Sequence, residues 1–150
     1  MDELTSLESW IGPLLHRLEP AGRARLARRI AQDLQRAQSE RIGQQRAPDG
    51  NQYARRKNQK RQKGGRIRRR KMFARLRQSK HLKARGNASE ASVFFIRRAA
   101  AIARVHQEGL VDQVRRGGPR VRYERRELLG FADGDKQGVI DTLLNHLSGL

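Results

Sequence analysis

Hydrophobic positions near the start of the chain recur at the spacing of an amphipathic helix. Residues 4–18 carry one apolar stripe with steps of three or four residues: Leu4, Leu7, Trp10, Ile11, Leu14, Leu15 and Leu18. Pro13 removes a backbone donor and predicts a kink in this helix. A second stripe within residues 21–45 predicts a longer helix that begins near Pro20. Two amphipathic helices joined by a short turn are typical of a helical hairpin, which we expect over residues 1–47.

The polar side of the second helix is rich in arginine. Its members are Arg25, Arg28, Arg29, Gln32, Gln35 and Arg36. After this helix, Ala47-Pro48-Asp49-Gly50 predicts a turn, because proline fixes φ, aspartate bonds to its own backbone and glycine tolerates positive φ.

The pattern changes to that of strands beyond residue 80. Residues 81–83 and 91–96 flank Gly86-Asn87 and predict a β-hairpin whose Val-Phe-Phe-Ile run is typical of a largely buried strand. The apolar spacing in 99–106 favours a short helix, with Gly109 as its C-cap. Met72, Phe73 and Leu76 lie just before the hairpin and favour one or two helical turns.

The last part of the chain predicts one more strand and one more helix. Val121 and Tyr123 alternate with arginines, as on a half-exposed strand, and Leu128, Leu129 and Phe131 are expected to return to the core. Asp133 or Asp135 would cap the last helix. We therefore expect an α+β core over residues 86–150, and an α+β fold class with an N-terminal helical hairpin, a long basic arm, a small antiparallel sheet and a C-terminal helix.

The basic arm, residues 48–85, is inferred from charge. The chain has 150 residues and a formal net charge of +19. Of its 34 Lys and Arg residues, 18 lie within residues 41–85, against one acid there, Asp49. Unpaired charges are costly to bury, so we expect a solvated segment, without regular structure over 51–70, that is held by its flanks and suited to a negative partner.

The contacts expected with that partner are the basic residues in the middle of the arm: Arg55, Arg56, Lys57, Lys60, Arg61, Lys63, Arg66, Arg68, Arg69, Arg70 and Lys71. A simpler interpretation, a loop that only keeps the protein soluble, stays open. Tyr53 and Phe73 are the only aromatic residues that could stack on bases within this window, which argues against sequence-specific or single-strand recognition.

Catalytic and metal-binding patterns are not found in the sequence. There is no cysteine, and His16, His81, His106 and His146 are scattered without the paired spacing of a metal site. Neither a phosphate-binding loop nor a nucleophile elbow occurs. No apolar run approaches the ~20 residues that span a bilayer. We expect no enzyme activity, no metal, no cofactor and no membrane partner.

The order of motifs resembles the phage virion morphogenesis family, also called the tail completion protein S family. Five features carry the resemblance: the helix pair ending at Arg41-Ile42, the turn at 45–50 before a Lys/Arg-rich segment, residues 102–109 (IARVHQEG), residues 126–131 (RELLGF), and a C-terminal amphipathic helix. The resemblance covers essentially the whole chain. One departure is in residues 126–130, which read Arg-Glu-Leu-Leu-Gly, because the family often has proline before the Leu-Gly pair.

The resemblance implies a structural virion protein of the tail and neck, assembled in the host cytoplasm. It would act at the head-proximal end of the tail, as a completion, neck or terminator protein, and let tails join heads. It implies a homo-oligomeric ring, with a hexamer as one arrangement, contacts with other neck and tail proteins, and non-specific contact with passing DNA. The N-terminal stripe would then be a subunit interface, through Leu4, Leu7, Trp10, Ile11 and Leu14, although ordinary intramolecular core is the favoured interpretation of this stripe. The alternative function is a basic nucleic-acid-binding protein that contacts the phosphate backbone without sequence specificity.

Overall fold

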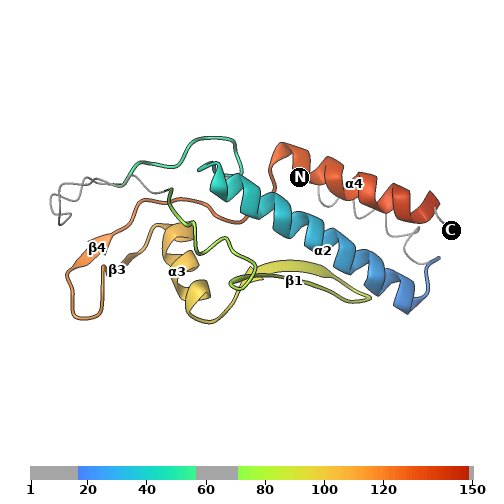
Figure 1. Ribbon diagram of the computed structural model, residues 1–150, viewed down its shortest axis with the longest axis horizontal. Helices are drawn as coiled ribbons and strands as arrows, with labels where there is room; N and C mark the ends of the chain where they lie inside the picture. Colours follow the sequence, from blue (N-terminus) through green and yellow to red (C-terminus); the bar gives the residue numbers. More distant parts are fainter. Residues whose placement is uncertain (1–16, 57–70, 149–150) are drawn as a thin grey trace.

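The computed structural model describes residues 17–56 and 71–148. Its longest helix, α2 (Pro20–Gly43), runs along the molecule, and the C-terminal helix and the first β-hairpin lie against its sides (Figure 1). The elements after it are β1 (Leu82–Gly86), β2 (Ala91–Phe95), α3 (Arg97–Glu108), β3 (Val111–Gln113), β4 (Arg120–Arg122) and α4 (Asp133–Ser148). In this part of the chain, three helices and two antiparallel two-stranded sheets form the predicted α+β fold.

The ends of α2 follow from its sequence. Pro20 occupies the first turn, where its missing N–H has no partner in any helix. The helix stops at Gly43, and Gln45 then adopts a φ of 62°, which breaks the helical path. The predicted helix at 21–45 is thus confirmed to within two residues.

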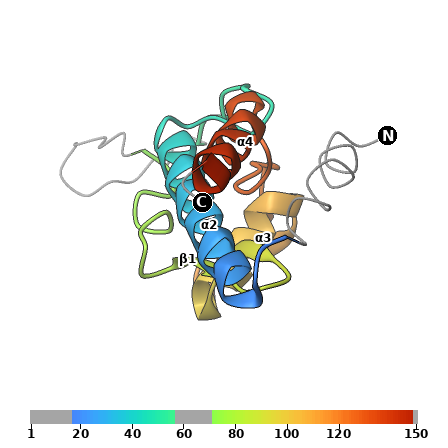
Figure 2. The same ribbon diagram turned by 90° about the vertical axis from the view of Figure 1, so that its right-hand side faces the viewer.

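Helix α4 covers one side of α2 and runs antiparallel to it (Figures 1 and 2). Leu26 of α2 and Leu143 of α4 are both almost fully buried, at 1% exposure, and belong to one apolar cluster. Further along, the Thr142 hydroxyl donates to the Asp33 carboxylate over 2.9 Å. α2 therefore packs on the C-terminal helix. The first predicted helix lies almost wholly outside the described residues.

The β1–β2 hairpin covers a second side of α2 (Figure 2). Its register pairs Leu82 with Phe95 and Gly86 with Ala91, which confirms the predicted hairpin, although its turn starts one residue later than expected, at Asn87. Leu82 is fully buried and its carbonyl accepts a hydrogen bond from the Gln35 side chain. The expectation of a largely buried second strand is wrong, because residues 93–96 are only half-buried.

The larger apolar cluster lies at the C-terminal end of α2 and gathers five separate segments. Its members are Ile42, Tyr53, Met72, Leu76, Ala99, Ala103 and Leu128. Both ends of the basic arm are therefore packed on the body, which the expectation of a solvated segment did not include. Residues 72–77 form turns, and the Arg77 N–H donates to the Phe73 carbonyl over 3.0 Å, which closes a single helical turn where one or two were expected. Met72 and Leu76 are buried as apolar residues should be.

The chain between α3 and α4 contains the C-cap of α3 and the ribbon formed by β3 and β4. Gly109 has a φ of 66° and caps α3, as predicted. Strands β3 and β4 form an exposed two-stranded ribbon, and the chain then returns to bury Leu128. Phe131 was expected in the core, but it is 45% exposed because the chain turns outward just before α4.

Candidate functional site: the junction that anchors the basic arm

The Pro48–Gly50 turn is the first component of a junction at the C-terminal end of α2. Gly50 has a φ of 89°, and the Asp49 carboxylate accepts a hydrogen bond from the Asn51 amide over 2.9 Å. Backbone bonds across the loop, such as Ala47 N to Asn51 O at 2.8 Å, close it. The predicted turn is confirmed, and its effect is to direct the chain towards the buried Tyr53.

The first end of the basic arm is held by Arg126, a buried residue in the segment before α4. Its Nε donates to the carbonyl of Ala54 over 2.8 Å, and its Nη2 donates to that of Arg55 over 3.2 Å. Burial lowers the pKa of Arg126, and the nearby Arg56 cation lowers it further. The Tyr53 hydroxyl donates to the Glu127 carbonyl over 2.8 Å, and burial raises the pKa of that hydroxyl.

The other end of the arm is held by the side chain of Gln45. Its amide nitrogen donates to the Met72 carbonyl over 2.9 Å, while its amide oxygen accepts from the Met72 N–H over 2.7 Å. This paired geometry mimics a step of a β-ladder and fixes the backbone at Met72. The described residues on either side of 57–70 are therefore fixed at two points, Arg55 and Met72.

A third clamp ties the junction to the C-terminal half of the chain through Arg41. Its guanidinium, 8% exposed as a residue, donates to the carbonyls of Leu128 at 2.7 Å and Arg46 at 3.0 Å. The neighbouring Gln38 donates to Asp135 over 3.1 Å and accepts from the Gly130 amide over 3.2 Å. Removing a buried charged donor would leave its acceptors unpaired, so this network stabilises the junction.

Gln107 on α3 completes the junction. Its amide oxygen accepts from the N–H groups of Leu128 and Leu129 over 2.8 and 3.0 Å, and its amide nitrogen donates to the Leu129 carbonyl over 3.0 Å. The Arg126 amide also donates to the His106 carbonyl over 2.8 Å. The separate motifs that carry the family resemblance thus meet in space at one place.

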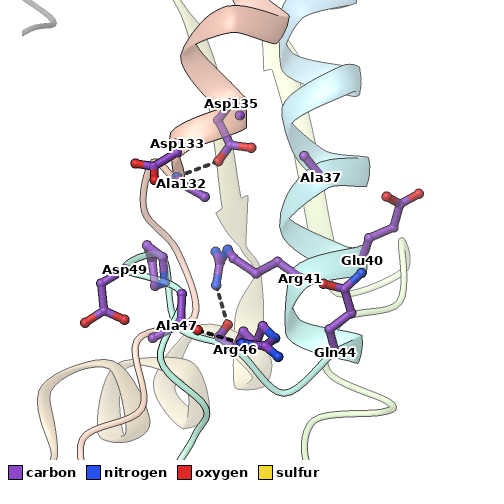
Figure 3. A pocket seen from close by; sticks show the side chains of 13 residues that line it. Ala37, Glu40, Arg41, Gln44, Arg46, Ala47, Asp49, Ala132, Asp133 and Asp135 are labelled. Carbon is purple, nitrogen blue, oxygen red and sulfur yellow. Dashed lines mark hydrogen bonds between the residues drawn. The ribbon is translucent and has the colours of Figure 1, made fainter.

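A hollow of about 420 Å³ opens beside the turn (Figure 3). Residues within 37–50 line one side and residues 132–135 the other, and the Arg41 guanidinium lies between them, donating to the Arg46 carbonyl. Asp135 is already engaged, since it accepts from the Ala132 amide over 2.9 Å. Within residues 17–56 and 71–148, no group of three His, Cys, Asp or Glu side chains is arranged to hold a metal ion. The arrangement holds chain segments in place, and no side chain here is paired as nucleophile and base.

Few of the residues predicted to contact a partner fall in the described part. Arg55, Arg56 and Lys71 are exposed and lie where the arm leaves the body. The other eight, from Lys57 to Arg70, lie outside the described residues. So do Leu4, Leu7, Trp10, Ile11 and Leu14, the predicted interface stripe. Across the described helices, none combines the length and hydrophobicity needed to cross a bilayer.

The clamping residues were not predicted from the sequence. Gln38, Gln45, Gln107 and Arg126 act through hydrogen bonds between side chains and the backbone, and such bonds leave no periodic pattern. One signal was present: Arg41 lies among the apolar positions of its helix, where a charged residue needs partners when buried.

The protein belongs to the phage virion morphogenesis family, whose family model matches residues 2–148. This places it among proteins that build virions. One relative is tail completion protein S of Escherichia phage P2, with 40% identity over 149 residues, which cover 98% of this chain and 99% of the P2 protein. No solved structure matches the chain.

Proposed function

We propose that this protein completes phage tails. It acts at the head-proximal end of the tail, in the neck, as a ring of identical copies, and lets finished tails join filled heads. The observation that supports this most strongly is the 40% identity to tail completion protein S of phage P2 across nearly the full length of both chains. The role is structural and needs no catalytic step.

The ring receives support from apolar surface left on the single chain. Val111, Val114 and Val121 of the β3–β4 ribbon are 39%, 49% and 36% exposed. A two-stranded ribbon with short strands is marginally stable alone, so packing against a neighbouring copy would stabilise it. The N-terminal stripe from Leu4 to Leu14 is proposed as a second contact between copies.

The clamped arm gives the ring a charged extension. Residues 55–71 carry the proposed anionic contacts, and Arg126 and Gln45 fix the described residues on either side of 57–70. Anchored in this way, the arm reaches an acidic surface of a neighbouring neck or tail protein, or the phosphates of passing DNA.

The test is complementation of a phage that lacks this gene, followed by electron microscopy of the particles. In one variant the eight Lys and Arg residues within 57–70 are replaced by Gln, and in its control the same fourteen positions are scrambled with their composition kept. We expect free heads and unjoined tails with the neutral variant and infective particles with the scrambled one. Purified protein should form rings in negative stain.

A strictly monomeric protein that is absent from the particle would overturn this proposal. The rival function, a nucleic-acid-binding protein without an assembly role, makes a different prediction. Such a protein would co-purify with nucleic acid at physiological salt, and its loss would leave head–tail joining intact. Capsid, baseplate and tail-tube genes beside its gene would favour assembly.

A further inference from the structure

Helix α2 has a third side that neither α4 nor the β1–β2 hairpin covers. Arg25, Arg28, Arg29 and Arg36 lie on it together with Gln32, and all five residues are exposed. They surround a shallow hollow of about 300 Å³, and among the described residues its lining consists of these five alone. We name this surface the α2 arginine face.

Among residues 17–56 and 71–148, the positive charge of the α2 arginine face is paired with an acidic side chain only at one end, at Arg36. Arg25 lies three and four residues before Arg28 and Arg29, at spacings where like charges on a helix repel. Arg36 pairs with Asp33 over 2.9 Å, but Asp33 also accepts from Thr142 and so is held towards α4. Glu40 lies one turn further on and lines the separate hollow of the junction.

A fifth guanidinium extends the row. Arg77 donates to the backbone and side-chain oxygens of Ser39 at 3.3 Å each, and it lies against Gly43, where an added Cβ would be 3.0 Å from its Cζ. At ~1.5 Å per residue, the row from Arg25 to Arg36 is about 16 Å long. That length matches about five base steps of a duplex at ~3.4 Å per phosphate along one strand.

We propose that the α2 arginine face binds the phosphate backbone of duplex DNA. Guanidinium groups suit phosphates because they donate in pairs to two oxygens. A protein partner is disfavoured, since protein interfaces have an apolar or aromatic centre and this hollow contains none. Single strands are disfavoured because no aromatic side chain is present for stacking. The five residues that define this surface lie outside the basic arm, of which only Arg77 extends the row, and the proposal does not depend on a ring.

The test measures binding of a short mixed-sequence duplex to the purified full chain over a series of salt concentrations. The variant is Arg28→Gln/Arg29→Gln. Its matched control is Arg98→Gln/Arg104→Gln on α3, which removes the same charge from exposed positions elsewhere. Each lost phosphate contact should reduce the slope of log K against log salt by about 0.9, so we expect a reduction of about 1.8 for the variant and little for the control.

Equal slopes for the two variants would overturn the proposal, because only net charge would then matter. A soluble acidic polypeptide that competes better than the duplex would also overturn it and favour a protein partner, as would tighter binding of a single strand. If Arg28→Gln/Arg29→Gln fails to fold by circular dichroism, Arg25→Gln/Arg36→Gln takes its place on the same face.

Discussion

At the scale of single residues, Gly86 shows how closely the hairpin approaches α2. A Cβ at this position would lie 2.2 Å from the Arg28 nitrogen and 2.4 Å from the carbonyl carbon of Ala27. These are backbone atoms of a helix and cannot move aside as the end of a side chain can. Gly86 is therefore required by packing, whereas the sequence pattern assigned it to a turn.

Replacing Gly86 with Ala should destabilise the protein by roughly 2–3 kcal/mol, because the added methyl group forces strand and helix apart. The measurement is the free energy of unfolding in urea. Gly138→Ala is the control: nothing lies within 4 Å of its Cβ position in the middle of α4, so it should stabilise by about 0.5–1 kcal/mol. Equal unfolding midpoints for the two variants would contradict the close approach.

His106 is the second residue whose surroundings have a measurable effect. Its ring packs edge-on against Phe73 and Tyr123, with centroids 4.9 and 5.0 Å away, and its Nδ1 is buried without a hydrogen-bond partner. Burial lowers the pKa of this imidazole below its ordinary value of 6.5, and the Arg126 and Arg56 cations lower it further.

Because the folded pKa of His106 is depressed, the unfolded chain binds a proton first as the pH falls. The contribution of neutral His106 to the free energy of unfolding is thus fully present above pH 6.5 and is lost as the pH falls through the folded pKa. His106→Phe keeps an aromatic ring between Phe73 and Tyr123 but cannot be protonated. We expect it to lose less unfolding free energy than wild type between neutral pH and about pH 5. If both proteins lost the same unfolding free energy between these pH values, His106 would not contribute to the pH dependence of stability.

At the scale of elements, the basic arm is held at Ala54 and Arg55 and again at Met72, by residues that lie outside the arm. Arg126 comes from the segment before α4, and Gln45 from the residues just after α2. Gln45 also adopts a φ of 62°, a left-handed conformation that asparagine tolerates better than most residues. The arm is thus held by hydrogen bonds between elements that are distant in sequence.

Gln45→Asn tests the clamp on Met72. Asparagine accepts the backbone conformation, but its shorter side chain cannot reach both Met72 groups. Losing two hydrogen bonds, each worth about 0.5–1.5 kcal/mol net, should speed amide exchange at Met72 about tenfold or more. Gln44→Asn, at the exposed neighbouring position, should leave that exchange rate unchanged. Equal rates in both variants would contradict a clamp at Gln45.

At the scale of the whole molecule, elements with a strong local signal were predicted well. The second helix, the hairpin, the α3 cap at Gly109 and the Pro48–Gly50 turn follow from periodicity and from residues with restricted φ. The partner of α2 was not predicted, since an apolar stripe does not say what covers it. The burial of Tyr53 and Met72 within a basic window was missed because net charge over a window hides single apolar anchors.

The overall excess of positive charge has its own measurable consequence. A compact chain with a net charge of +19 repels itself more than the same chain unfolded. Raising ionic strength from low values to ~0.15 M shortens the Debye length to ~8 Å, and we expect the urea midpoint to rise. The variant with eight neutral residues within 57–70 should show a weaker rise. A wild-type urea midpoint that does not change with ionic strength would contradict the expectation.

The clamps at Arg55 and Met72 also bear on how such phages diversify. Because the residues on either side of 57–70 are fixed by hydrogen bonds, insertions, deletions or substitutions within 57–70 should leave the apolar cluster of the junction intact. Recombination between related phages could therefore exchange residues 57–70 to suit a new tail or head and leave the rest of the fold unchanged.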